Sequence, residues 1–194
     1  EIQTPEHGAG LDAFLRTRSP TVVGILNGVD YDEWSPEHDK LIPHRYDRDH
    51  LEGKERNKQS LLAQLGLPYV AGTPVLGAVS RLVGQKGLDL LADVLPGLLR
   101  RHRFQFVMLG SGDAAYEAAL AALADAHPGR IALRIGYDEM LAHRIEAGAD
   151  IFLMPSRFEP CGLNQMYSLR YGTVPVVHHV GGLADTVVDA TPQA

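Results

Sequence analysis

Apolar and polar residues divide most of this chain into alternating blocks of two kinds. Short apolar runs of strand length are followed by longer segments in which apolar residues recur every three or four positions, as on one face of a helix. This pattern predicts strands at residues 74–79, 104–109, 130–135, 149–154 and 173–177. It predicts helices at residues 87–103, 113–126, 138–147 and 163–171, with Asp113 as an N-cap, and a last segment at 181–188 that opens on a Gly-Gly turn.

The first 73 residues are less regular. The pattern there predicts helices at residues 11–16 and 52–65 and a strand at 21–26, which the turn signal Asn27-Gly28 ends. Residues 30–52 are polar, and Trp34 is their one large apolar anchor. A loop of this length in a compact domain is usually functional or mobile.

Strands and helices that alternate through short loops form a parallel sheet with helices on both faces. The fold class is therefore α/β, a Rossmann-like doubly wound parallel sheet. In such sheets ligands bind beyond the carboxyl ends of the strands. The loops that follow the five strands are all rich in glycine or polar residues, as one ligand crevice requires: residues 80–87, 110–113, 136–138, 155–162 and 178–182.

The loop at residues 155–162 lies between a predicted buried strand and a predicted helix. Backbone N–H groups at the start of that helix are unpaired and favour an anion. Gly162 lets the backbone approach a ligand closely, and Glu159 can accept hydrogen bonds from hydroxyls beside the anion. The combination suggests a sugar phosphate or nucleotide sugar, although an ordinary turn with a solvated glutamate has the same residues.

Two cations stand in the loop after the first strand of the regular region. Arg81 and Lys86 lie five residues apart, so both can reach one diphosphate. The arginine can bind phosphate oxygens through two N–H groups, and the lysine adds a compact positive charge. Two solvated loop cations are the alternative. The segment 110–115 loosely fits a dinucleotide fingerprint, but no acidic residue closes the next strand, and Asp138 fits a helix start better than a ribose ligand. An NAD site is therefore less favoured than a nucleotide-sugar site.

Other residue types carry weaker signals. Tyr137 can stack on a nucleobase or simply pack with a wet hydroxyl. His178-His179 lacks further metal ligands nearby, so no metal site is predicted. Cys161 has no histidine partner at a telling spacing, and a small buried residue is its simplest interpretation.

Composition limits the partners. The chain has 194 residues and a formal net charge of -6, which gives no electrostatic support for a nucleic-acid partner. One cysteine excludes an internal disulfide framework and fits a reducing compartment. No apolar run approaches the ~20 residues of a membrane span, so no membrane partner is expected. Both ends look cut from something longer.

Several motifs together resemble bacterial glycogen synthase and plant starch synthase. They are residues 80–82 and 85–89, 155–165, 171–177 and 181–187, supported upstream by residues 1–5, 10–12 and 24–30. The match runs in order through nearly the whole chain.

The resemblance implies the C-terminal half of a two-domain GT-B-type glycosyltransferase, with residues 1–35 as interdomain linker and first strand region and 36–194 as the nucleotide-sugar-binding domain. The family transfers glucose from ADP-glucose, or UDP-glucose in some members, to the nonreducing end of an α-1,4-glucan with retention. The missing N-terminal domain would supply the opposite wall of the cleft. No cofactor is implied, and the location would be the bacterial cytoplasm, or a plastid in a plant.

By position, the resemblance makes Arg81 and Lys86 the diphosphate clamp and Glu159 the residue that holds glucose hydroxyls near the reacting carbon. It places substrate-binding residues at Tyr137, Cys161, Gly162, Leu163, Asn164 and Gln165. Related transferases often carry a second glutamate eight residues after the first, where this chain has Tyr167, so no covalent nucleophile is assigned. A retaining transferase with another donor, and a nucleotide-sugar-binding module without catalysis, remain alternatives.

Overall fold

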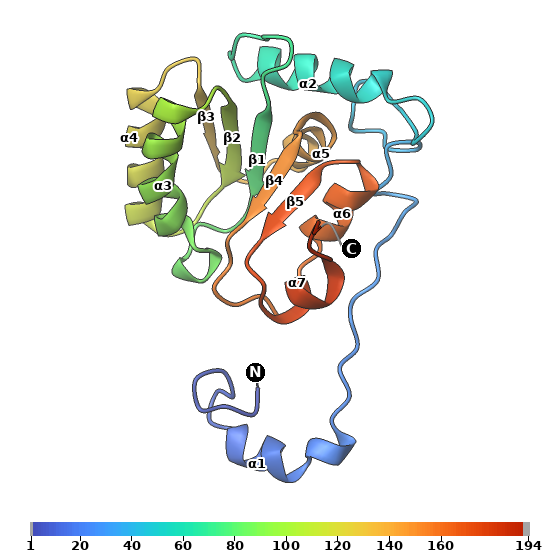
Figure 1. The fold of residues 1–194 in the computed structure, drawn as a ribbon, viewed down its shortest axis with the longest axis vertical. Helices are drawn as coiled ribbons and strands as arrows, with labels where there is room; N and C mark the ends of the chain where they lie inside the picture. The colour runs from blue at the N-terminus through green and yellow to red at the C-terminus, as the bar shows by residue number, and fades with distance from the viewer. Residues whose placement is uncertain (1, 192–194) are drawn as a thin grey trace.

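The computed structural model describes residues 2–191, and its core is a parallel sheet between two layers of helices (Figure 1). The five strands lie in the order β3-β2-β1-β4-β5, and every neighbouring pair is parallel. The strands are β1 (Val75–Val79), β2 (Gln105–Gly110), β3 (Ile131–Ile135), β4 (Ile151–Met154) and β5 (Val174–Val177). The predicted α/β fold and all five of these predicted strands are confirmed.

The helices form where the spacing of apolar residues predicted them. Most of their ends lie within one or two residues of the predicted positions. They are α1 (Asp12–Thr17), α2 (Glu52–Gln64), α3 (Leu88–Arg101), α4 (Ala114–Ala126), α5 (Glu139–Gly148), α6 (Asn164–Arg170) and α7 (Gly181–Thr186), with 3-10 turns at Ser19–Thr21 and Gly84–Lys86. Asp138 caps α5, its side chain accepting a hydrogen bond from the backbone N–H of Leu141. Asp113 holds the corresponding position of α4, but its side chain makes no capping bond.

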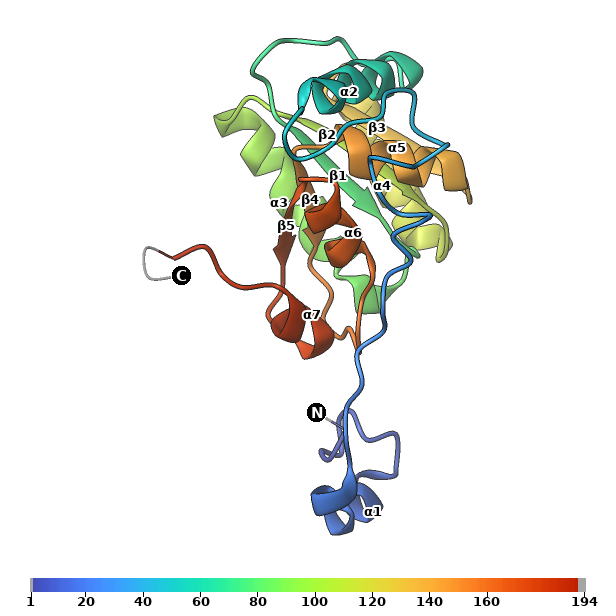
Figure 2. The same cartoon turned by 90° about the vertical axis from the view of Figure 1, so that its right-hand side faces the viewer.

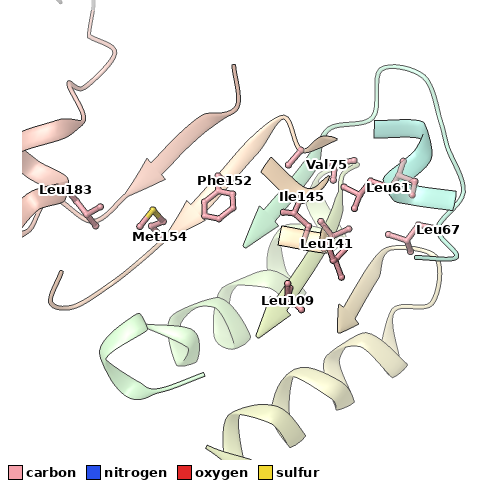
Figure 3. Close-up of a cluster of buried hydrophobic side chains, with 12 residues drawn as sticks. Leu61, Leu67, Val75, Leu109, Leu141, Ile145, Phe152, Met154 and Leu183 are labelled. Atoms are coloured by element: carbon pink, nitrogen blue, oxygen red, sulfur yellow. The ribbon is translucent and has the colours of Figure 1, made fainter. Parts of the chain in front are cut away.

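Alternate side chains of the strands point to opposite faces of the sheet, so the core has two halves. On one face α3 and α4 pack on β1–β3 through residues such as Leu95, Phe106 and Leu120. On the other face α2, α5 and α7 pack on the sheet through residues that include Leu61, Ile145 and Phe152, as Figure 3 shows. Helices cover both faces of the sheet, so a ligand cannot reach these faces. The free backbone N–H groups and polar side chains of a ligand site therefore lie in the loops at the strand ends.

The predicted strand at residues 21–26 is wrong. This segment runs as extended chain between α1 and the body of the molecule and pairs with no strand among residues 2–191 (Figures 1 and 2). Val23 is 80% exposed and Ile25 is 90% exposed. A β-branched run permits an extended backbone, but a strand also needs a neighbour to pair with.

The long polar loop after residue 30 is ordered by α5 and α6 and by the segment that follows α6. Trp34 stacks on His143 and on Tyr167, with ring centroids 3.6 and 4.0 Å apart. Tyr46 donates a hydrogen bond from its hydroxyl to the backbone oxygen of Tyr171 at 2.8 Å. The predicted role of Trp34 as the apolar anchor of this loop is confirmed.

Beneath this loop a glutamate is buried, which gives the fold a pH dependence. Glu146 lies on α5, where burial raises its pKa to about 8 against the opposing hydrogen bond from Ser168 and the charge of Lys54. Its pKa is thus above the unfolded value of 4.5. Between these pH values the folded chain holds a proton that the unfolded chain has released, so stability falls as pH rises.

We therefore expect the free energy of unfolding to fall more steeply between pH 5.5 and 8 in the native chain than in Glu146→Gln. The expected difference is about 3 kcal/mol, because each unit of a pKa shift corresponds to about 1.4 kcal/mol and this pH range spans slightly more than two units of it. Urea unfolding of both chains at the two pH values measures it. Glu52→Gln, which removes an exposed carboxylate from the start of α2, is the control, and an equal slope in Glu146→Gln would show that Glu146 titrates normally.

Candidate functional site

The loops at the carboxyl ends of β1 and β4 enclose a cavity of about 430 Å3. Arg81, Lys86 and Glu159 all line it, although they come from segments more than 70 residues apart in the chain. The expectation that these three side chains gather at one edge of the sheet is met. The rest of the wall comes from strand ends and the start of α6: Ala78, Val79, Ser80, Leu88, Leu91, Leu153, Met154, Pro155, Ser156, Pro160, Cys161, Gly162, Leu163 and Asn164, with Asn27 from the N-terminal segment.

The turn that carries Lys86 is bound directly to the loop that carries Glu159. The side-chain amide of Gln85 donates to the backbone oxygen of Phe158 at 2.8 Å, and the N–H of Arg157 donates back to Gln85 at 2.8 Å. Gly87 follows with φ +66, and a Cβ on it would lie 2.1 Å from the backbone oxygen of Pro155. Only glycine lets the two loops approach so closely.

Arg157 adds a second clamp between the same loops. Its guanidinium forms a two-pronged ion pair with Asp89 at the start of α3, with nitrogen–oxygen distances of 2.6 and 2.5 Å. The same guanidinium lowers the pKa of Asp89 to about 2 by hydrogen bonding. The sequence offered no signal for this contact, because the two residues are 68 positions apart.

Lys86 and Glu159 form an ion pair inside the cavity. The ammonium nitrogen lies 2.5 Å from Oε2 of Glu159, and the two side chains are only 17% and 10% exposed. Ser156 also donates its hydroxyl to Oε2 at 3.1 Å. The carboxylate is thus held in one orientation, and its charge is offset by the lysine.

Arg81 differs from Lys86 in its contacts. Its side chain is exposed and, within residues 2–191, forms no hydrogen bond or ion pair. It lies between the first cavity and a second one of about 270 Å3, because both cavities share Val79, Ser80, Arg81 and Asn164. A free guanidinium at the boundary of two cavities is placed to bind an anion that extends from one to the other.

The loops after β2 and β3 line the second cavity. Tyr137 lines it together with Gly110, Ser111, Gly136 and Asp138, and the tyrosine is 88% exposed. Tyr137 therefore lies at the rim of this cavity and does not line the cavity that contains Glu159.

The start of α6 is fixed against the sheet. Asn164 donates its side-chain N–H to the backbone oxygen of Val79 at 2.9 Å, which joins α6 to the end of β1. The N–H groups of Leu163 and Asn164 belong to the first turn and have no partner within the helix itself. Both residues line the first cavity, as do Cys161, whose thiol is free, and Gly162.

Gln165 has a different position from the other predicted binding residues. It is fully buried and lines neither cavity. Its amide nitrogen donates to the backbone oxygens of Cys161 and Gly162 and to the hydroxyl of Thr186, at 3.0, 3.2 and 2.9 Å. Gln165 thus supports the loop from behind, and Gly182 packs against the same loop, where a Cβ would lie 2.4 Å from the Cα of Cys161.

Taken together, the two adjoining cavities fit a ligand with an anionic centre, a hydroxyl-rich part near Glu159 and a planar part near Tyr137. These features lie at the carboxyl edge of a Rossmann-like sheet. Over residues 73–193 the chain matches the family model for group 1 glycosyl transferases, and it belongs to this family.

Within this family the chain is similar to bacterial glycogen synthases. The chain is 61% identical over 189 residues to a glycogen synthase of Anaeromyxobacter dehalogenans, covering 97% of this chain and 39% of that protein. It is 57% identical to a glycogen synthase of Thioalkalivibrio sulfidiphilus, covering 99% of this chain and 40% of that protein.

A solved structure has nearly the same fold. It is the catalytic domain of starch synthase IV from Arabidopsis thaliana bound to ADP and acarbose, with a TM-score of 0.92 and 39% identity over 98% of this chain and 39% of that chain. The resemblance to glycogen and starch synthases is confirmed, and the chain spans about two fifths of the length of the relatives it matches.

Proposed function

We propose that this chain is the donor-binding part of a retaining glycogen synthase, which transfers glucose from ADP-glucose to the nonreducing end of an α-1,4-glucan. The observation that carries the proposal is the joined pair of cavities with Arg81 at their boundary and the Lys86–Glu159 pair inside one of them. The bacterial glycogen synthases that match 97% or more of this chain support the same activity. Their source also favours the bacterial cytoplasm as its location.

In this proposal the donor diphosphate lies between the cavities. Arg81 and Lys86 bind its oxygens, and the first N–H groups of α6 at Leu163 and Asn164 face the same negative charge. The nucleoside extends to the second cavity, where its base lies against Tyr137. The glucose lies in the first cavity, where Glu159 accepts hydrogen bonds from its hydroxyls.

These positions determine what the residues do during transfer. The bond between C1 of glucose and the diphosphate oxygen breaks, and its electron pair stays on that oxygen. Arg81 and Lys86 stabilise this growing negative charge, and their effect is larger in a water-poor cavity than in bulk solvent. The Glu159 carboxylate faces the positive charge that develops at the sugar. The oxygen of the acceptor hydroxyl bonds to C1, and its proton passes to the departing diphosphate oxygen.

The opposite wall of such a cleft has to come from another domain. Without it, water reaches Arg81 and screens its charge, and the reacting atoms are not enclosed. We therefore expect the isolated chain to bind ADP and ADP-glucose weakly and to elongate no glucan. The longer enzyme that contains this chain is expected to do both.

Two measurements check this expectation. Calorimetric titration of the isolated chain with ADP, UDP and NAD tests the nucleotide site, and tighter binding of UDP than of ADP would indicate a different donor. Transfer of radiolabelled glucose to glycogen, run with the isolated chain and with the longer enzyme, tests the activity. Elongation by the isolated chain at a rate near that of the longer enzyme would show that no second wall is needed, and no elongation by either would refute the proposed activity.

A further inference from the structure

A third cavity, of about 380 Å3, lies where the polar loop after residue 30 packs on α5. It shares no lining residue with the two cavities of the donor site. Its wall is rich in titratable groups: Asp30, Asp32, Glu33, His38, Asp39, Lys40 and His143, with Leu41. The proposed transfer reaction uses none of them.

His143 is the central residue of this cluster. It is fully buried, and its Nδ1 lies 2.8 Å from Oδ2 of Asp39. Asp39 is itself buried and also accepts a hydrogen bond from the Tyr171 hydroxyl at 2.6 Å. Because a carboxylate oxygen accepts hydrogen bonds, this contact places a proton of His143 on Nδ1.

The other ring nitrogen of His143, Nε2, is buried and has no hydrogen-bond partner among residues 2–191. A buried polar nitrogen without a partner is costly and uncommon in a native structure. A carboxylate that orients an imidazole through one nitrogen and leaves the other free is the arrangement that metal-binding histidines have.

Two carboxylates lie close to this histidine. Glu33 comes from the loop and Glu139 from the first turn of α5, and one ligand atom of each residue and of His143 lie within 4.8 Å of one another. Both glutamates are exposed, and neither carboxylate has a hydrogen bond or ion pair within the described part of the chain. Ligand atoms around one Zn2+ ion lie about 3.4 Å apart, a separation that two exposed side chains reach by changing rotamers.

We propose that Glu33, Glu139 and His143 bind one Zn2+ ion, with Asp39 as the residue that orients His143. An imidazole ligand favours zinc over the hard cations Mg2+ and Ca2+, which prefer oxygen alone. Three protein ligands leave one position of a tetrahedral site to water. The bound ion would join the loop to α5, a structural role that does not depend on the proposed transferase activity.

The site contains its own reporter. Trp34 is the one tryptophan of the chain, and its ring lies 3.6 Å from that of His143. The experiment is a titration of the full chain, freed of metal by a chelator, with ZnCl2 and separately with MgCl2. Tryptophan fluorescence reports the site, calorimetry gives the stoichiometry, and thermal unfolding reports stabilisation, because a ligand that binds only the folded state raises the unfolding temperature.

We expect one Zn2+ per chain, a saturable change in Trp34 fluorescence, a higher unfolding temperature and no such response to Mg2+. Glu33→Gln and Glu139→Gln should each weaken Zn2+ binding at least about tenfold. Glu52→Gln, which also removes an exposed carboxylate from the first residue of a helix, should not. His143→Asn, which keeps an N–H toward Asp39 and removes Nε2, should abolish the fluorescence response.

Cys161→Ser tests whether the single thiol binds the added ion instead, and it should leave Zn2+ binding unchanged. Zn2+ binding that Glu33→Gln and Glu139→Gln leave unaltered would place the ion on other histidines and overturn the proposal. So would the absence of a saturable 1:1 response, or an equal response to Mg2+.

Discussion

Lys86→Ala in the longer enzyme is expected to lower turnover roughly 10²–10³-fold, the usual effect of removing one charge that stabilises a developing oxyanion. Lys86 lies in the cavity and is only 17% exposed, so its interaction with a bound diphosphate is weakly screened by water. The substitution also leaves Glu159 without its lysine. We therefore expect a stability loss of about 2 kcal/mol, because a partly buried charge loses its partner.

The measurement is steady-state transfer of glucose to glycogen, combined with urea unfolding to separate the two effects. Lys40→Ala is the matched control, since it removes an exposed lysine that lines neither donor cavity. Lys86→Met keeps the aliphatic stem and should lose as much turnover as Lys86→Ala. Near-normal turnover in either variant would show that Lys86 serves only as the ion-pair partner of Glu159.

The sheet could be predicted from sequence because each strand is a short apolar run. These runs are separated by segments in which apolar residues have the spacing of a helix. β2, for example, is buried along its whole length, and after Gln105 its residues 106–109 are all apolar. The segment at residues 21–26 is also a short apolar run, yet it pairs with no strand in the part of the chain that the structure describes. Composition shows that a backbone can extend, whereas pairing depends on which other strands are present.

The site could be predicted only as a set of loops. Parallel strands end at one edge, so Arg81, Lys86 and Glu159 had to be near one another. Their contacts were not predictable, because the Lys86–Glu159 and Arg157–Asp89 pairs join segments 73 and 68 residues apart. Whether a side chain faces the cavity or supports its wall, as Gln165 does, depends on packing that no spacing reveals.

The pair of Asp39 and His143 had no sequence signal at all. The two residues are 104 positions apart, one in a polar loop and the other inside an amphipathic helix. A lone histidine in a helix is usually solvated or satisfied by a neighbour. Only its burial and its unpartnered Nε2 separate it from that ordinary case.

Glu159 provides the sharpest test of the reaction chemistry. Glu159→Gln keeps the size of the side chain and an oxygen that accepts the Ser156 hydroxyl, but it removes the negative charge. If that charge faces a positive centre at the sugar, its loss raises the barrier without changing the nucleotide contacts. We expect turnover to fall by roughly 10²-fold or more, as for other preorganised charges in active sites.

The nucleotide response decides between the two roles of Glu159. In the native chain Lys86 is paired with Glu159, so the glutamine variant frees the ammonium for the diphosphate. ADP binding by Glu159→Gln should therefore be unchanged or somewhat tighter while turnover falls, measured by calorimetry and by glucose transfer on the same preparation. Glu52→Gln, a substitution of an exposed residue on α2 outside both cavities, is the control and should alter neither quantity. A parallel loss of ADP affinity and turnover in Glu159→Gln would mean that Glu159 shapes the cavity and does not act on the reacting sugar.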